Sequence, residues 1–291
     1  MELHQLRYLR AVVRTGSVTA AAEAEHVAQP SISKQLRLLE RELGTPLFHR
    51  VGRRVVPTPA ALHLADSADR VLDELAAAAA AVAGPSAAAA ANVRLCAVET
   101  AADQLVPPAL ARLIKEWPHA RVSVEMLGTD DALARVLSDD VDFALVALPM
   151  ADSRLDVHPL LEEDVLLAVP LKHRWARSGR APLIRVLTDP TLLLTMPGHG
   201  LRAQVDAAAR ELGVEVAGRI EMRSQQALLA MVAAGAGVTF APRISVAARE
   251  DVAGVMLHPG LRRQLGWVRR RGRHLSPVAQ ALLRELGAED I

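Results

Sequence analysis

Hydrophobic residues recur at helical spacing along the first 45 residues and predict three short helices. The first begins near Leu3. Gly16 is expected to end it in the left-handed conformation that glycine tolerates, and Ser17 is expected to cap the second. The second helix covers about 18–26 and is rich in alanine. The third begins near Pro30, because proline suits a first helical turn in which its missing N–H needs no partner.

The third helix has two different faces. Its apolar stripe consists of Ile32, Leu36, Leu39 and Leu43, and Gly44 follows as the expected end. The opposite face carries Ser31, Lys34, Gln35, Arg37 and Arg41. Short polar groups at the start of a helix can approach base edges, and longer basic groups can reach phosphates. A helix, a tight turn and a second helix presented outward are typical of a helix-turn-helix protein.

Two short strands are predicted around Gly52, and they form a basic wing next to the third helix. Arg50, Arg53 and Arg54 flank the turn and can reach phosphates. Residues 1–57 carry nine lysines and arginines against five acids, whereas the rest of the chain carries 25 against 28. This uneven charge favours a polyanion as the partner of the N-terminal region. A small three-helix module with ordinary surface charge is the alternative.

A long linker helix is predicted over about 58–82. Near-heptad positions are occupied by Leu62, Ala65, Asp69, Leu72, Ala76 and Ala79, with Ala68 beside the interrupting aspartate. The helix would be roughly 38 Å long and has no obvious partner within the head, so we expect it to pair with a second helix. A solvated spacer is the alternative. Gly84-Pro85-Ser86 is expected to end the helix, and the alanine run 87–91 to form a hinge.

From Asn92 onward, strand-like runs alternate with helical patterns. Strands are predicted over 93–98, 122–126, 142–147, 165–170, 191–195, 216–221, 237–241, 254–258 and 264–269. Helices are predicted over 105–117, 130–139, 201–212, 225–234 and 277–286. The alternation predicts an α/β body of parallel sheets with helices on both faces. Its length fits two lobes.

The order of the N-terminal motifs resembles the winged helix-turn-helix head of LysR-type transcriptional regulators. The residues that carry the resemblance are 20–22, 29–36, 39–44, 47–50 and 57–60. It implies base and phosphate contacts by Gln29, Ser31, Ser33, Lys34, Arg37, Arg50, Arg53 and Arg54. The sequence departs from the family pattern at Ala28, where a hydroxyl cap is common, and at Ala60, where glycine is common.

The rest of the chain resembles the effector domain of the same family, a two-lobed α/β domain similar to periplasmic solute-binding proteins. Its landmarks are 107–110, 117–118, 142–145, 232–238 and 241–242. The resemblance implies a DNA-binding domain at 1–57, a dimerisation helix and hinge at 58–91, and an effector domain at 92–291. Lobe I would comprise 92–162 and 265–291, and lobe II 163–264.

The family resemblance also implies partners. It implies a sequence-specific, double-stranded DNA-binding transcriptional regulator that forms a dimer and, by a further pairing, a tetramer. A small-molecule effector between the lobes would modulate its activity, and RNA polymerase is a candidate protein partner.

Candidate effector-binding residues follow from the rule that ligands of open α/β sheets bind at the carboxyl ends of strands. Residues at such positions are Thr100, Ala101, Thr129, Thr195, His199, Arg202 and Gln225. The resemblance implies that the hydroxyl groups of Thr100 and Thr129 contact the effector. Arg202 and the glycine-flanked His199 would suit an anionic metabolite such as a carboxylate. A surface role for Arg202 and a capping role for Thr100 stay open, and Glu99 weakens the case for an anion.

An enzyme is the main alternative class of protein. The histidines of the body have no metal-ligand spacing, and the sequence contains neither a Gly-x-Ser-x-Gly elbow nor a phosphate loop. We therefore expect no catalytic residue, no metal site and no cofactor.

A redox sensor is the second alternative. The single cysteine, Cys96, cannot form an intramolecular disulfide and lies in an apolar strand pattern, but a disulfide between subunits stays open.

Two further features concern location and charge. No apolar run reaches the roughly 18–20 residues of a membrane helix, and the N-terminus lacks a signal-peptide pattern, so the sequence predicts a cytoplasmic protein without membrane contact. The basic run 269–273 is interpreted as a strand end and turn rather than as a second nucleic-acid patch.

Overall fold

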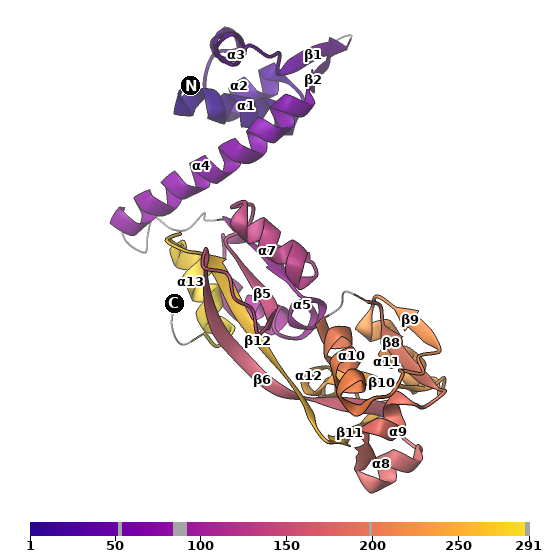
Figure 1. Ribbon diagram of the computed structural model, residues 1–291. Coiled ribbons are helices and arrows are strands. Elements are labelled where there is room, and N and C mark those ends of the chain that lie inside the picture. The colour runs from indigo at the N-terminus through magenta and orange to yellow at the C-terminus, as the bar shows by residue number, and fades with distance from the viewer. Residues whose placement is uncertain (52–53, 84–91, 198–199, 289–291) are drawn as a thin grey trace. The chain divides into compact units, whose positions relative to one another are not determined.

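The computed structural model describes residues 1–51, 54–83, 92–197 and 200–288 (Figure 1). The chain divides into two compact units, 1–91 and 92–291, each with hydrophobic cores of its own. Within the described residues, no helix is both long and apolar enough to cross a membrane.

The N-terminal unit begins with three helices and a two-stranded wing. They are α1 (Leu3–Thr15), α2 (Val18–Ala24), α3 (Gln29–Leu43), β1 (Phe48–Val51) and β2 (Arg54–Pro57). α1 and α3 end at Gly16 and Gly44, whose φ angles of 64° and 65° are left-handed. The Ser17 side chain caps α2 by accepting the Ala20 N–H. These elements confirm the helices and wing predicted from the sequence, although α2 ends two residues early.

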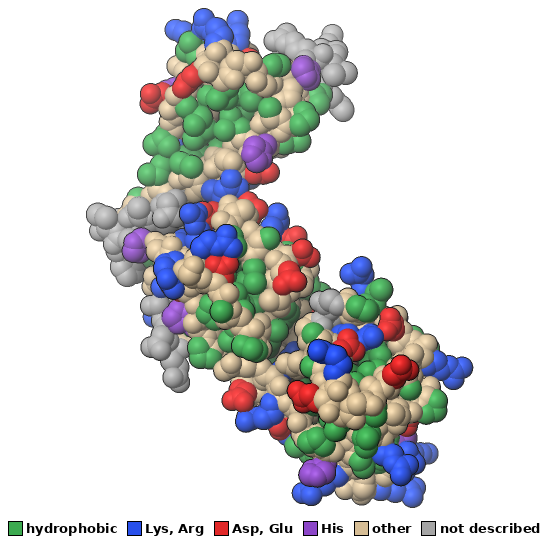
Figure 2. All heavy atoms as spheres, in the orientation of Figure 1, with side chains coloured by type: hydrophobic (Ala, Val, Ile, Leu, Met, Phe, Trp, Pro, Cys, Tyr) green, Lys and Arg blue, Asp and Glu red, His purple; other side chains and the backbone are tan. Residues whose placement is uncertain are grey.

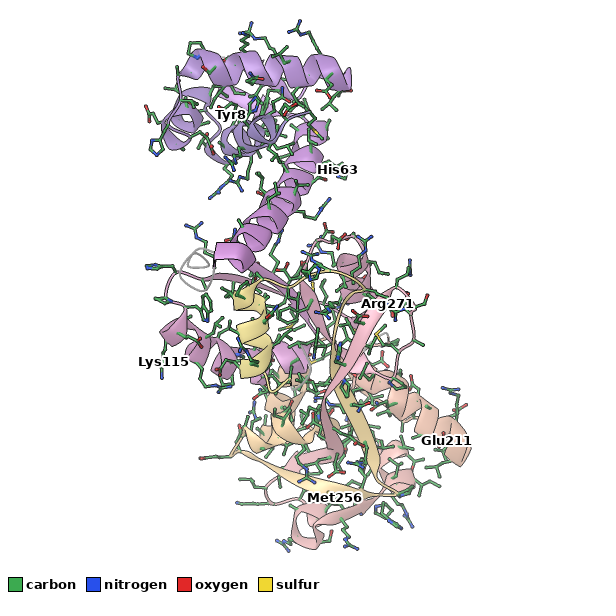
Figure 3. All side chains as sticks on the ribbon, turned by 90° about the vertical axis from the view of Figure 1, so that its left-hand side faces the viewer. Tyr8, His63, Lys115, Glu211, Met256 and Arg271 are labelled. Carbon is green, nitrogen blue, oxygen red and sulfur yellow. The ribbon has the colours of Figure 1, made fainter. Side chains whose placement is uncertain are left out.

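The long helix α4 (Pro59–Ala83) leaves the wing and packs on its own head (Figures 1 and 3). Ala61 and Ala65 belong to the same core as Leu9 of α1, and Arg10 forms an ion pair with Asp69 at 3.5 Å. The prediction that the helix has no partner within the head is therefore wrong for its first half. Asp69 interrupts the apolar seam because it faces α1.

The C-terminal unit is a mixed α/β domain. Its strands are β3 (Asn92–Ala97), β4 (Arg121–Met126), β5 (Phe143–Leu148), β6 (Leu155–Pro170), β7 (Arg180–Pro182), β8 (Leu192–Thr195), β9 (Ile220–Met222), β10 (Val238–Pro242), β11 (Val252–His258) and β12 (Leu261–Arg270). Its helices are α5 (Glu99–Gln104), α6 (Val106–Glu116), α7 (Thr129–Leu137), α8 (Arg174–Ser178), α9 (Leu183–Leu187), α10 (Gly200–Leu212), α11 (Gln225–Ala233), α12 (Arg243–Ala247) and α13 (Pro277–Glu285).

The main sheet runs in the order β4-β3-β5-β12-β6-β10-β8-β9, and β11 pairs with both β6 and β7. The outer pairs β3–β4, β3–β5, β10–β8 and β8–β9 are parallel, as predicted. The central pairs β5–β12, β12–β6 and β6–β10 are antiparallel, so the prediction of wholly parallel sheets is wrong. The reason is that β6 and β12 are long strands that run beside each other from one lobe into the other (Figure 1).

The sequence placed a strand only over 165–170, whereas β6 begins at Leu155. Residues 155–164 include a proline and four acids, a composition that is uncommon in strands. β12 pairs with this stretch from Arg270↔Leu155 onward and makes it a strand through tertiary contact. The predicted lobe boundaries fall inside both long strands.

The basic run at the end of β12 is paired with acids. Arg269 and Arg271 contact Asp156 at 3.3 and 3.2 Å, Arg273 contacts Asp142 at 2.7 Å, and Arg270 pairs with Asp139. Figure 3 labels Arg271 at this strand end. These ion pairs confirm the interpretation of the run as a strand end and turn.

Candidate functional site

The first candidate site is the solvent-facing side of α3. Gln29, Ser31, Lys34 and Arg37 are exposed there, and Ser33 is half-buried. The Gln29 amide donates to Ser33 Oγ at 2.8 Å, and Arg37 Nε donates to the Ser33 carbonyl at 3.0 Å. Figure 2 shows basic side chains gathered over this part of the N-terminal unit. The face therefore presents short polar groups and longer cations together.

No acid in the described part of the head neutralises the cations of α3. Among the residues that the structure describes, Lys34, Arg37 and Arg41 form no ion pair with a carboxylate. An exposed cation without an acidic partner keeps its full attraction for an external anion such as a phosphate.

The start of α3 lacks a side-chain cap. Ala28 is the N-cap residue and has an extended backbone, but its methyl group cannot accept a hydrogen bond. Ser224 at the start of α11, by contrast, accepts the Ala227 N–H at 3.2 Å. The absence of a capping bond predicted from the sequence is confirmed.

Glu40 on α3 holds the wing in place. Its Oε1 atom accepts the N–H groups of Leu47 and Phe48, at 2.8 and 3.2 Å, where the chain enters β1. The backbone places Arg50 and Arg54 in the paired strands of the wing, whereas Arg53 lies outside the described residues. The sequence did not identify this positioning role of Glu40, since the residue was noted only as part of a family motif.

The second candidate site is a cavity of about 780 Å³ in the C-terminal unit. One wall comes from the ends of β3 and β4 with α5 and the start of α7. The other comes from the start of α10, residue Gln204 and the segment before α11. The strand ends and helix starts meet as expected for a ligand site in an α/β fold. Its volume is typical of cavities that hold small molecules.

Two of the predicted effector residues line this cavity. Thr100 is 4% exposed, and its Oγ1 accepts from Arg263 at 3.3 Å. Thr129 also lines the cavity, and its Oγ1 accepts the Ala147 N–H at 3.4 Å. The structure therefore brings together the two threonines that the sequence singled out.

Arg202 lies outside the cavity lining. Its Nε donates to Asp206 at 2.8 Å, and its Nη1 donates to Glu221 at 2.6 Å and to the Thr195 carbonyl at 3.0 Å. Thr195 and Ala101 are buried and are also outside the lining. The guanidinium that suggested an anionic ligand is thus neutralised by two carboxylates of its own lobe.

Gln225 is buried behind the cavity rather than in its wall. Its Nε2 donates to the Phe240 carbonyl at 3.0 Å, and its backbone N–H donates to Glu99 at 2.9 Å. His199 lies outside the described residues.

A buried ion pair forms the floor of the cavity. Arg263 on β12 donates to Glu163 Oε1 on β6 at 2.5 Å, and the two side chains are only 7% and 5% exposed. Glu163 Oε2 also accepts the Ile244 N–H at 2.8 Å. Burial lowers the pKa of Arg263, and the adjacent Glu163 carboxylate opposes this effect. The sequence missed this pair, because the predicted strands began just after each of its members.

Glu99 joins the two walls of the cavity. It is the first residue of α5, and its carboxylate accepts the Ser224 hydroxyl at 3.0 Å and the Gln225 N–H at 2.9 Å. These two donors lie at the N-terminus of α11, where a helix favours a negative charge. The Glu99 carboxylate therefore caps a helix across the cavity from its own.

The only cysteine of the chain is buried away from these sites. Cys96 on β3 is 0% exposed and belongs to the core that contains Val136 and Val146. Burial and the nearby Glu125 raise the pKa of its thiol. The described residues contain no cluster of three or more histidine, cysteine or acidic side chains arranged to hold a metal ion.

Both parts of the chain match known families. The model described as "Bacterial regulatory helix-turn-helix protein, lysR family" matches residues 3–62, and the model described as "LysR substrate binding domain" matches residues 86–290.

Similar proteins agree with these matches. The DNA-binding transcriptional dual regulator OxyR of Escherichia coli K12 is 30% identical over 276 residues, which cover 94% of this chain and 90% of the relative. The transcriptional activator CmpR of Synechocystis is 26% identical over 296 residues, covering 99% and 95%. A full-length OxyR structure from Pseudomonas aeruginosa has a TM-score of 0.70 at 25% identity, covering 98% of this chain and 94% of that one.

The helix-turn-helix head, the two-lobed ligand domain and the near full-length similarity lead to one identification. The resemblance inferred from the sequence is confirmed, and the chain belongs to the LysR family of DNA-binding transcriptional regulators with a ligand-binding domain.

Proposed function

We propose that the regulator reads DNA through α3 and anchors on phosphates through α3 and the wing. The contacts would come from Gln29, Ser31, Ser33, Lys34, Arg37, Arg50, Arg53 and Arg54. The observation that carries this proposal is the exposed face of α3, where polar tips and unpaired cations lie together. Short side chains at the helix start would read base edges, and the arginines would hold the backbone.

Salt dependence tests this DNA contact directly. DNA sites would first be selected from a random pool with the full-length protein, and the affinity would then be measured over a range of salt concentrations. If a dimer neutralises about six phosphates, log affinity should fall against log salt with a slope of about −5. A flat salt dependence would reject DNA binding by the head.

We propose that subunits pair through exposed apolar side chains of α4 and that dimers pair again into a tetramer. Val71 and Leu75 are four residues apart, lie on one side of the helix and are both 44% exposed, and Leu62 on another side is 47% exposed. Large apolar side chains left on a long helix favour a partner helix. Pairing would present two copies of α3 to one duplex. Sedimentation of a Leu75→Glu variant should show smaller particles than the wild type.

We propose that a small molecule in the cavity sets the activity of the regulator. The cavity joins both lobes, so a ligand there can favour one arrangement of the lobes over another and thereby shift the packing of subunits. A ligand that binds the folded state should raise the melting temperature of the protein. A Thr100→Val variant should lose that rise if the hydroxyl contacts the ligand.

We propose regulation by ligand binding rather than catalysis or oxidation. Several relatives are named hydrogen peroxide-inducible genes activators, which makes peroxide sensing the second candidate function. Cys96 is the only cysteine of this chain and is fully buried with a raised thiol pKa, which disfavours the reactive thiolate. The relatives are also named as regulators of transcription and not as enzymes.

A further inference from the structure

We propose that the cavity binds a ligand through a positively charged group, an amine or a guanidinium, that sits against Asp103, Asp130 and Asp131. All three aspartates line the cavity. This inference rests on the proposed function of the cavity as the ligand site and adds the chemical class of the ligand.

The position that suits an anion is already occupied by the protein. The N-terminus of α11 reaches the cavity at Ser224, and a helix N-terminus is a favourable place for a carboxylate or phosphate. Glu99 fills that place with its own carboxylate, at 3.0 Å from Ser224 Oγ and 2.9 Å from the Gln225 nitrogen. An anionic ligand would have to displace Glu99 or lie beside its charge.

The arginine at the floor of the cavity is also satisfied by an acid. Arg263 lines the cavity, but Glu163 accepts from its Nε at 2.9 Å and from its Nη2 at 2.5 Å. The remaining donor, Nη1, points to Thr100 Oγ1. A buried arginine that is matched by one carboxylate contributes little net attraction for a further anion.

The acids that remain outnumber the bases. Asp103 is half-buried, and Asp130 and Asp131 are exposed in the first turn of α7. Of the described residues that line the cavity, the exposed Arg223 is the one further cation. Burial and the neighbouring Glu99 raise the pKa of Asp103, whereas a hydrogen bond from Gln226 opposes the rise. A bound cation would stabilise the charged form of this carboxylate.

Apolar side chains complete the lining. Met126, Leu127, Met196 and Leu201 border the cavity beside the acids. Methionine and leucine accommodate alkyl or aryl groups by dispersion contacts. The lining as a whole fits a small organic cation, with a hydrocarbon part against the methionines and the charged end at the aspartates.

Matched probes test the sign of the ligand charge. Binding would be measured on the full-length protein by thermal shift and then by calorimetry, at equal probe concentration and ionic strength. Two sets each compare an amine, an alcohol and a carboxylate of similar size: butylamine, butanol and butyrate, and benzylamine, benzyl alcohol and benzoate. A third set compares agmatine, putrescine, butanediol and succinate. We expect the amines and the guanidine to raise the melting temperature and the carboxylates to leave it unchanged. Carboxylates that stabilise the wild type more than the matched amines would overturn the inference, as would a set in which no cation stabilises it.

Three substitutions assign the effect to the cavity. Asp103→Asn should weaken the binding of the best cationic probe about tenfold, since it removes a charge-assisted hydrogen bond. Glu99→Gln keeps an oxygen that accepts from Ser224 but removes the charge at α11, so this variant should gain binding of the matched carboxylate. Asp251→Asn removes the same charge from an exposed acid paired with Arg249 outside the lining, and it should leave probe binding unchanged.

DNA binding is measured on the same samples. If the protein binds DNA with the expected salt dependence but no cationic probe stabilises it, the ligand class is rejected and the proposed DNA-binding function stands. If the wild type does not bind DNA, the proposed function itself is rejected. Equal weakening by Asp103→Asn and Asp251→Asn would show that the overall charge, and not the cavity, attracts the probe, and would also overturn the inference.

Discussion

The α3 surface and the ligand cavity use the same residue types in opposite ways. On α3, Lys34 and Arg37 are exposed, and no described carboxylate pairs with them. Around the cavity, Arg263 and Arg202 are held by acids of the protein itself. A cation indicates an anionic partner only where folding leaves it unpaired. This difference separates the proposed DNA-contacting surface of α3 from the cavity, where Arg263 is already paired with an acid.

The two regions also differ in how far apart their residues lie in the sequence. The residues proposed to contact DNA all fall between positions 29 and 54, within one helix and the adjacent wing. The cavity combines residues from 98 to 263, which meet only because β6 and β12 run between the lobes. Local geometry therefore determines the first site, and tertiary folding determines the second.

The largest expected effect is on the buried pair of the cavity floor. Arg263→Ala should lower the free energy of unfolding of the C-terminal unit by about 3–5 kcal/mol, because it leaves the Glu163 charge buried without a partner. All three tryptophans lie at 117, 175 and 267, so tryptophan fluorescence during urea unfolding reports on this unit.

The adjacent residue supplies a matched control. Arg262 pairs with Glu162 at 3.1 Å, but its side chain is 63% exposed. Arg262→Ala should therefore change stability by at most about 1 kcal/mol. Equal destabilisation by the two substitutions would contradict the view that pairing inside the cavity differs from pairing at the surface.

The next effect concerns the unpaired cations of α3. Arg37→Ala should weaken DNA binding about tenfold, because it removes a charge-assisted hydrogen bond to a phosphate, and should make the salt slope shallower by about one for each phosphate that is no longer neutralised. Stability should change by less than about 0.5 kcal/mol, since the side chain is exposed. Fluorescence anisotropy with selected DNA measures the first, and thermal unfolding measures the second.

Arg7 on α1 provides the comparison for this variant. It is exposed as well and carries the same charge, but it does not lie on α3. Arg7→Ala should leave most of the DNA affinity intact. If both substitutions weakened binding equally, the whole charge of the head rather than the α3 face would be responsible.

The sequence predicted the head closely because its signals are local. Gly16 and Gly44 end helices, Ser17 caps one, and Ala28 leaves one uncapped, each within a few residues of the feature it determines. The packing of α4 was missed, because Ala61 and Ala65 look the same whether they face the head or a second subunit. Periodicity identifies an apolar face but not what covers it.

The cavity was predicted only in part, for a related reason. Thr100 and Thr129 each lie three residues after the end of a strand, so the strand-end rule found them. Arg263 and Glu163 lie within β12 and β6, and nothing in the local sequence shows that these strands cross between lobes. Arg202 was expected to face a ligand, but the spacing of residues did not reveal that Asp206 and Glu221 would bind it first.

A smaller effect tests the uncapped start of α3. Ala28→Ser would supply the missing hydroxyl acceptor and should stabilise the head by about 1 kcal/mol. Ser17→Ala should have the opposite effect in the same unit, since it removes an existing cap on α2. Hydrogen exchange of the amides of α2 and α3 measures both changes. A serine at position 28 that left exchange unchanged would show that α3 is held by packing and wing contacts alone.

The smallest effect is expected at the cysteine. Cys96→Ala should leave the DNA binding of the protein unchanged before and after treatment with hydrogen peroxide, because the thiol is buried and its raised pKa disfavours the reactive thiolate. DNA affinity of wild type and variant, each with and without peroxide, gives the four values needed. A loss of response in the variant alone would assign oxidation sensing to Cys96. It would also place a functional group in the buried core of the C-terminal unit, where we expect none. The proposed DNA contacts are exposed on α3, and the proposed ligand contacts line the cavity.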